Sequence, residues 1–292
     1  MNALVTGATG FVGGRLADAL AADGVAVRCL VRDRARAAHL RHELHEGDAL
    51  DEASLRGAGR GVSVAYYLIH GMGRGGGAEF AAREQLAARN FARMARAEGV
   101  ERVVYLGGLG EPRSRHLRSR HETALTLAAE GPPLTYLRAA MVVGAGSESF
   151  LTLYHLAKRL PVMIAPAWVR TLTQPIGIED AVAYLRAAPH AEPGEVQIGG
   201  PDVLSYGAML DTVAGGLGRR EPLRIPVPLL TPKLSSLWVG LVTPVDAGVA
   251  RPLIEGLSTE TVVTAPAAAR RFGVDPQPFP ATVETALREL AA

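Results

Sequence analysis

Thr6-Gly7-Ala8-Thr9-Gly10-Phe11-Val12-Gly13 is the stretch that decides the fold of this 292-residue chain. Residues 2–5, directly before it, form a short apolar run that predicts a buried strand. Residues 15–22, directly after it, carry apolar side chains at helical spacing and end at Asp23-Gly24, which predicts a helix. The stretch is therefore a glycine-rich turn between the first strand and the first helix.

Each glycine of this turn has a physical role. Gly7 permits the tight turn, Gly10 lets the backbone approach a pyrophosphate, and Gly13 lets the helix lie close to the sheet. The free N–H groups and the positive dipole at the helix start suit a phosphate charge. The spacing is G-x-x-G-x-x-G instead of the common G-x-G-x-x-G, but its position between a strand and a helix predicts dinucleotide binding.

Short apolar runs alternate with helical segments over the first 150 residues. Strands are predicted at residues 25–31, 62–69, 100–106 and 134–137, and helices at residues 78–98 and 119–129. Such alternation predicts parallel strands joined by right-handed crossovers. The expected fold class is α/β, with a Rossmann-type doubly wound parallel sheet.

The second half of the chain is less regular. Helices are predicted at residues 151–160, 178–187 and 282–290, whereas the prolines within residues 201–264 argue against long strands there. We expect a nucleotide-binding domain at residues 1–200, in which residues 139–170 contribute to the pocket. Residues 201–264 are expected to form a smaller substrate lid, and residues 265–292 a helical tail that packs back on the domain.

Composition and charge exclude several classes of protein. The formal net charge is +2, and no block of Lys or Arg is present that would follow a nucleic-acid backbone. Cys29 is the single cysteine, which excludes an internal disulfide and a cysteine-built metal site. No apolar run reaches the roughly 20 residues that a membrane-spanning helix needs. We expect a cytoplasmic monomer or homodimer with no nucleic-acid partner and no stable membrane insertion.

Further segments carry the motifs of a known superfamily. They are Gly47-Asp48-Ala49-Leu50-Asp51, Tyr67-Leu68-Ile69-His70, Asn90 with residues 99–106, Leu106-Gly107-Gly108-Leu109-Gly110, His116-Leu117-Arg118-Ser119-Arg120 and residues 176–182. With the glycine turn, they make the chain similar to the short-chain dehydrogenase/reductase superfamily, in its extended and atypical branches. Within this superfamily, the chain resembles the NAD(P)H-binding, NmrA-like or YbjT-like proteins.

The resemblance implies which residues contact the cofactor. They are Gly7, Thr9, Gly10, Phe11, Val12, Gly13, Arg32, Asp48, Ala49, Leu68, Ile69, His70, Asn90, Leu106, Gly107, Gly108, Arg120, Ala139 and Ala140. In the family, the residue matching Asp48 holds the adenine amino group. At the end of the second strand, Arg32 suits a 2′-phosphate, whereas Asp33 offers the carboxylate that a ribose hydroxyl would need. We expect NADPH in preference to NADH.

The family's catalytic Ser, Tyr and Lys are all replaced. Alignment with the expected strand at residues 134–138 puts His116 at the Tyr position, Arg120 at the Lys position and Gly107-Gly108 at the Ser position. Arg120 can still hold ribose hydroxyls, but it cannot shuttle protons. His116 titrates near neutrality when unperturbed and is the expected proton donor.

These replacements leave two hypotheses about function. One is an NADPH-dependent oxidoreductase that transfers a hydride to an apolar, electron-poor acceptor such as a quinone or an enone. The other is a non-catalytic NADP(H)-binding sensor, regulator or complex-stabilising protein. Met141, Tyr154 and Trp238 are the expected substrate contacts, and Tyr154 is also a candidate replacement acid.

Two other segments invite a functional interpretation. His39, His42 and His45 recur at every third position, but Glu43 and Glu46 among them favour a solvated surface helix, so no metal site is expected. Residues 71–77 are glycine-rich and are interpreted either as a mobile loop beside the nicotinamide or as a surface loop.

Overall fold

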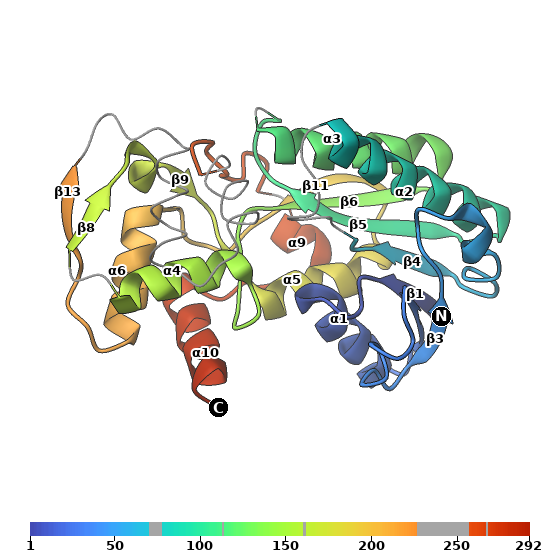
Figure 1. The fold of residues 1–292 in the computed structure, drawn as a ribbon, viewed down its shortest axis with the longest axis horizontal. Helices are drawn as coiled ribbons and strands as arrows, with labels where there is room; N and C mark the ends of the chain where they lie inside the picture. Colours follow the sequence, from blue (N-terminus) through green and yellow to red (C-terminus); the bar gives the residue numbers. More distant parts are fainter. Residues whose placement is uncertain (70–77, 113, 160–161, 227–256, 267) are drawn as a thin grey trace.

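The computed structural model describes residues 1–69, 78–112, 114–159, 162–226, 257–266 and 268–292 (Figure 1). The predicted contacts His70 and Trp238 and the glycine-rich residues 71–77 lie outside these described residues. No helix in the described part of the chain is long and apolar enough to cross a membrane.

A seven-stranded sheet forms the centre of the molecule, with the order β11-β6-β5-β4-β1-β2-β3 and every neighbouring pair parallel. Its strands are β1 (Asn2–Thr6), β2 (Ala26–Val31), β3 (Glu43–Glu46), β4 (Val64–Tyr67), β5 (Arg102–Gly108), β6 (Leu134–Ala139) and β11 (Gly194–Ile198). The chain leaves β1 towards β2 on one side and later returns to β4 on the other, so the strand order reverses at β1. In such sheets this reversal opens a crevice at the carboxyl ends of the strands.

Helices cover both faces of this sheet, as Figure 1 shows. On one face lie α1 (Phe11–Ala22), α5 (Ile178–Ala187) and the short α9 (Ala268–Phe272), and on the other lie α2 (Ala78–Ala97) and α3 (Arg115–Glu130). Alternate residues of β1 supply the two cores, because Val5 packs in one and Leu4 in the other. The doubly wound α/β fold predicted from the sequence is therefore confirmed.

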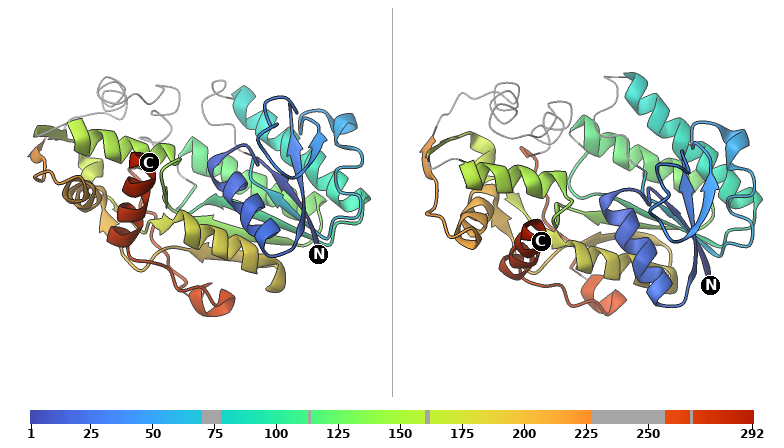
Figure 2. Two further views of the ribbon diagram at one scale, coloured as in Figure 1. Left: turned by 90° about the horizontal axis from the view of Figure 1, so that it is seen from below. Right: turned by 60° about the horizontal axis from the view of Figure 1, so that its bottom comes forward.

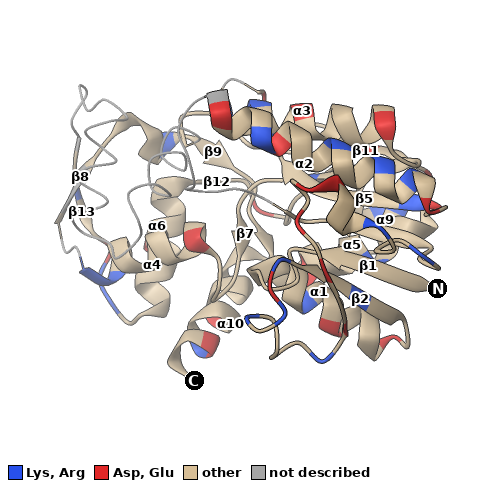
Figure 3. Ribbon diagram, turned by 45° about the vertical axis from the view of Figure 1, so that its right-hand side comes forward, with Lys and Arg blue, Asp and Glu red and all other residues tan. Residues whose placement is uncertain are grey.

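The outer helices α2 and α3 carry acidic and basic residues interspersed along their length (Figure 3). Arg89 and Arg93 on α2 both pair with Glu130 at the end of α3, at 2.9 and 2.8 Å. Salt bridges at exposed positions contribute little each, so the buried face of these helices stabilises this layer more than the ion pairs do.

A third hydrophobic core lies beyond the carboxyl end of the sheet. It is built by α4 (Glu148–Arg159), α6 (Tyr206–Gly216), α10 (Phe279–Ala291) and the 3-10 turn η2 (Ala167–Arg170). Figures 1 and 2 place α4, α6 and α10 together, at the opposite end of the molecule from β3. Arg15 on α1 also reaches Glu289 on α10 at 2.8 Å, which ties this core to the sheet domain.

Short strand pairs and turns complete the described chain. The pairs are β7 (Val142–Val143) with β10 (Ile176–Gly177), β9 (Leu172–Thr173) with β12 (Leu204–Ser205), and β8 (Val162–Ala165) with β13 (Leu223–Pro226). The remaining turns are η1 (Glu52–Leu55) and η3 (Ala188–His190). The third core is assembled from both sides of α5 and β11 in the chain, because α4 and η2 precede these elements of the sheet domain, whereas α6 and α10 follow them.

The predicted surface helix around His39, His42 and His45 is wrong. His45 lies in the edge strand β3, and Glu43 of the same strand pairs with Arg28 of β2 at 2.8 Å. His42, just before this strand, contacts Asp18 at 2.9 Å. Cross-strand pairing at a polar sheet edge overrides the helix pattern here. Among the described residues no group of three potential metal ligands is found.

Candidate functional site

A cavity of about 720 Å³ lies between the sheet domain and the third core. Most of the residues that the sequence predicts as contacts line it. These are Gly7, Thr9, Gly10, Phe11, Val12, Gly13, Arg32, Asp48, Ala49, Leu68, Ile69, Leu106, Gly107, Gly108, His116, Arg120, Ala139, Ala140 and Met141. The cavity therefore extends from the glycine turn along the carboxyl edge of the sheet to the start of α4.

The glycine turn forms one end of this cavity, and its geometry depends on missing side chains. Gly7 has a φ of +66°, and a Cβ there would lie 2.7 Å from the Leu68 carbonyl oxygen. A Cβ on Gly13 would lie 2.2 Å from the Gly7 carbonyl oxygen, so only glycine lets the first turn of α1 rest on the loop. Thr6 joins β1 to β4 because its Oγ1 accepts from the Leu68 N–H at 2.8 Å.

This turn fits the pyrophosphate of a dinucleotide. Gly10 is the N-cap of α1, no side chain caps the helix, and no acidic residue occupies its first turn. The N-terminal end of α1 therefore keeps its positive character towards the cavity, where a phosphate group would accept from backbone N–H groups.

Residues 32–36 follow β2 at the end of the cavity where the sequence predicts the adenosine. Arg32 is exposed and lines the cavity, whereas Asp33 is used locally, accepting from the N–H groups of Ala35 and Arg36 at 2.9 and 3.2 Å. Asp33 also pairs with the Arg36 side chain at 3.4 Å. Arg34 donates to the Leu44 carbonyl oxygen. Of these four residues, Arg32 is the one that lines the cavity.

Asp48 and Ala49 form the neighbouring wall. Asp48 accepts from the Leu50 N–H at 2.9 Å through Oδ1. Asn90, a predicted contact, is buried and does not line the cavity; its Nδ2 donates to the Ala49 carbonyl oxygen at 2.9 Å. Asn90 thus holds the backbone of Ala49 in place without contacting the cavity itself.

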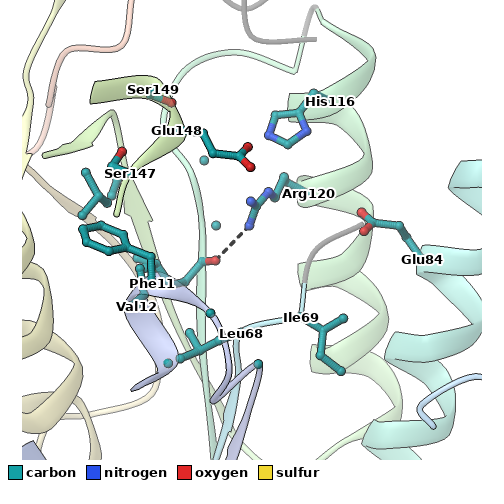
Figure 4. A pocket seen from close by; sticks show the side chains of 18 of the residues that line it. Phe11, Val12, Leu68, Ile69, Glu84, His116, Arg120, Ser147, Glu148 and Ser149 are labelled. Carbon is teal, nitrogen blue, oxygen red and sulfur yellow. Dashed lines mark hydrogen bonds between the residues drawn. The ribbon is translucent and has the colours of Figure 1, made fainter. Parts of the chain in front are cut away.

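The opposite end of the cavity is built on α3. Ser114 caps this helix by accepting from the Leu117 N–H at 3.2 Å, and His116 and Arg120 follow one turn apart on the face towards the cavity (Figure 4). Arg120 is only 9% exposed and donates to the Leu106 carbonyl oxygen at 3.2 Å. Within the described residues, no carboxylate lies within 4 Å of its guanidinium.

His116 does not have the near-neutral titration expected from the sequence. Burial, followed by the positive charge of Arg120, lowers the pKa of His116 to about 4. Both causes act in the same direction, because burial and a neighbouring cation each disfavour the imidazolium. At neutral pH the imidazole is therefore neutral in the structure, with one N–H to donate.

Glycine at the position of the family's serine has a packing cause. A Cβ on Gly107 would lie 2.6 Å from the Tyr136 ring, which stacks on Tyr105 with ring centroids 5.2 Å apart. A Cβ on Gly108 would lie 2.6 Å from a terminal methyl of Leu117. The aromatic pair thus occupies the space that a side chain at position 107 would need.

Several residues that line this end of the cavity are not predicted by the sequence. Glu148, the first residue of α4, extends towards His116 and Arg120 from the facing wall (Figure 4). Trp168 and Tyr206 from the third core pack edge to face, with ring centroids 6.0 Å apart, and add an apolar wall. The positions of these residues depend on how the third core packs, and no local sequence motif predicts them.

One predicted substrate contact lines the cavity and another does not. Met141 lines it, whereas Tyr154 does not, because it lies on α4 with its hydroxyl accepting from Lys158 Nζ at 2.9 Å and its ring against His155. Trp238 lies outside the described residues.

Comparisons with known proteins agree with this geometry. Residues 7–139 match the NAD(P)H-binding family. No curated protein matches the sequence with significance. Among solved structures, triphenylmethane reductase from Citrobacter sp., complexed with NADP(H), is 18% identical with a TM-score of 0.75, over 98% of this chain and 100% of that one.

Two further structures are similar over nearly the whole chain. UDP-glucose 4-epimerase from Thermotoga maritima, with UDP-glucose, is 15% identical with a TM-score of 0.73 and full coverage of both chains. The Bordetella bronchiseptica enzyme WbmG, in complex with NAD, is 18% identical with a TM-score of 0.73, over 99% of this chain and 93% of that one. The family match is confined to residues 7–139, and the chain as a whole shares the fold of these solved structures, two of which hold NADP(H) or NAD.

Proposed function

We propose that this protein is an NADPH-dependent oxidoreductase that reduces an apolar, electron-poor acceptor such as a quinone or an enone. The observation that carries the proposal is one continuous cavity, which runs from the glycine turn to the apolar wall of the third core. A dinucleotide on the turn would reach the space enclosed by Met141, Trp168 and Tyr206. Such a space accepts a small apolar molecule beside the reactive end of the cofactor.

Arg32 supports NADPH as the cofactor. It is the basic side chain at the adenosine end that lines the cavity, and Asp33 is already engaged by two backbone N–H groups. A guanidinium at this rim suits a 2′-phosphate, whereas a free carboxylate would favour the ribose hydroxyls of NADH.

NADPH, when bound, would supply a hydride, and reduction of a quinone or an enone would also take one proton. The chain's own residues perform the remaining tasks. Arg120 holds ribose hydroxyls through its free guanidinium N–H groups, and His116 donates a hydrogen bond to the acceptor oxygen and delivers the proton. Gly107 offers no hydroxyl to polarise a carbonyl, which favours acceptors that are already electron-poor.

A second candidate function is supported by the same end of the cavity. The low pKa of His116 and the absence of the Ser-Tyr-Lys set suit a protein that binds NADP(H) to sense it or to stabilise a complex. In that case the cofactor end of the cavity is functional and the acceptor end is a binding surface.

Calorimetry and a turnover assay distinguish the two candidates. We expect NADPH to bind more tightly than NADH, and NADPH absorbance to fall with a quinone from a panel of quinones, enones, simple ketones and a triphenylmethane dye. Simple ketones, which need the strongest proton assistance, should react slowest. Tight NADPH binding without oxidation by any acceptor would favour the sensor, and equal weak binding of both nucleotides would contradict both.

A further inference from the structure

We propose that Glu148 is a positioning residue, whose carboxylate pairs with His116 across the cavity in the cofactor complex and holds the imidazole protonated. The inference rests on the proposed function and deepens it, because it names the source of positive charge on the proton donor.

The two residues come from facing walls of different parts of the molecule. His116 lies on α3 of the sheet domain, and Glu148 is the first residue of α4 in the third core. In Figure 4 the Glu148 carboxylate extends from the α4 wall towards the His116 ring and the Arg120 guanidinium. Both residues line the same cavity.

The backbone of Glu148 is held in place, whereas its side chain is free. Ser147 caps α4 by accepting from the Phe150 N–H at 3.3 Å, and Phe150 is fully buried in the third core. The Glu148 side chain is exposed and has no hydrogen bond or ion pair with any described residue. A rotamer change therefore moves its carboxylate without disturbing the fold.

Among the described residues, the charges around His116 leave Glu148 as the available counter-ion. Arg120 is the cation one turn away on α3. On α2, Arg83 and Glu84 also line the cavity, but Glu84 already accepts from the Ser119 hydroxyl at 2.9 Å. A carboxylate that approaches from α4 would oppose the two causes that now keep His116 neutral, since it stabilises the imidazolium and offsets the Arg120 charge.

Pairing with Glu148 should raise the pKa of His116. An opposite charge within roughly 4–6 Å shifts a pKa by about 1–3 units, here upward for an imidazole. A proton donor with a raised pKa stays protonated to higher pH, so the acceptor would receive its proton over more of the physiological range.

Glu179 provides a matched control. It is an exposed glutamate in the first turn of α5, just as Glu148 is in the first turn of α4, but it does not line the cavity. Glu148→Gln and Glu179→Gln thus remove the same charge from the same kind of helix end, and they differ in proximity to His116.

The primary test reads the His116 imidazole directly by NMR titration of the NADP⁺-saturated protein, with the signal assigned through a His116→Gln variant. We expect Glu148→Gln to lower the His116 pKa by about one unit or more relative to wild type, a shift of the size that one nearby charge produces. Glu179→Gln should leave it unchanged. Because all samples hold the same nucleotide, its charge cancels in the comparison.

A second readout uses turnover with 1,4-naphthoquinone. Glu148→Gln should lower kcat and move its alkaline fall to lower pH with the KM for NADPH unchanged, and Glu148→Asp should restore most of the wild-type pH profile. A purely structural role would not shift the profile. An unchanged His116 pKa in Glu148→Gln would overturn the inference even if the protein reduces quinones. A His116 shift without turnover would support the pairing and refute the oxidoreductase, and failure of NADP⁺ to bind would remove both.

Discussion

The two ends of the cavity are made in different ways. The phosphate end is formed by backbone atoms. Gly7 meets the conformational requirement of the turn and Gly13 its steric requirement, and the uncapped N-terminus of α1 supplies a positive electrostatic field. The acceptor end consists of side chains. His116 and Arg120 on α3 face Glu148, which lies on α4 of the third hydrophobic core.

This difference separates binding from chemistry. The glycine turn lies within one strand-turn-helix unit and is held against Leu68 after β4, so its geometry depends mainly on local backbone. The acceptor end depends on how the third core sits against α3, and its electrostatics depend on burial, as the lowered pKa of His116 shows. Substitutions at the first end should therefore act on affinity, and substitutions at the second should act on rate.

The largest effect is expected for Gly10→Val. Its Cβ would lie 3.1 Å from the Gly7 carbonyl oxygen, so a small backbone shift would be needed, while the branched side chain would occupy the phosphate position at the start of α1. We expect calorimetry to show no NADPH binding and circular dichroism to show a folded protein.

Gly13→Val provides the contrast, because its Cβ would lie 2.2 Å from backbone, and we expect loss of folding stability there. Retained NADPH affinity in Gly10→Val would contradict the phosphate site itself.

The next effect is expected for His116→Phe at the other end. The ring keeps most of the bulk and loses the donor, so turnover of an enone should fall by the ~10²–10⁴-fold of general acid catalysis, with NADPH affinity little changed. A quinone should be affected less, because its reduced anion is better stabilised. In wild type, kcat/KM should rise as pH falls towards about 4, since it reports the free enzyme, in which the His116 pKa is lowered to about 4. Wild-type rates in the variant for every acceptor would remove His116 as the acid.

The sequence predicted the phosphate end better than the acceptor end for a physical reason. Gly7, Gly10 and Gly13 encode backbone geometry locally, so their spacing and their position between a strand and a helix were enough to predict the turn. His116 and Arg120 came from a family resemblance, and the structure brings them together on one face of α3. Glu148 and Trp168 could not be predicted, because the third core that positions them is assembled from segments far apart in the chain.

The same reason accounts for the errors in the fold. Strand β3 has the sequence Glu43-Leu44-His45-Glu46, whose polar residues give no apolar period, and pairing with β2 alone makes it a strand. The alternating apolar residues of β1 and β2 are buried on both faces and were correctly assigned. Local periodicity therefore predicts the central strands, whereas edge strands and a core assembled from separate segments depend on tertiary contacts.

A smaller effect is expected where the family's serine is replaced. Restoring it as Gly107→Ser should destabilise the protein by about 1–3 kcal/mol, the usual cost of overpacking, because the buried Tyr105–Tyr136 stack has no room to move. Gly108→Ser meets only a terminal methyl of Leu117 and should cost less. Chemical denaturation of both variants measures the difference. Equal stability of the two variants would show that the aromatic pair does not determine the glycine at position 107.

The smallest effect is expected for Arg32→Ala, which tests the adenosine rim. A hydrogen-bonded charge pair with a phosphate is worth about 1.5–3 kcal/mol, but Arg32 is exposed and screened, so we expect a loss of NADPH affinity near the lower bound, about tenfold. NADH affinity should stay the same, because it lacks the phosphate. Arg36→Ala is the matched control, since Arg36 is also exposed but pairs with Asp33 and does not line the cavity. The loss should shrink as salt is raised in the calorimeter, as screening requires. If Arg32→Ala weakens both nucleotides equally, the residue shapes the rim without reading the phosphate, and cofactor preference must come from elsewhere in the cavity.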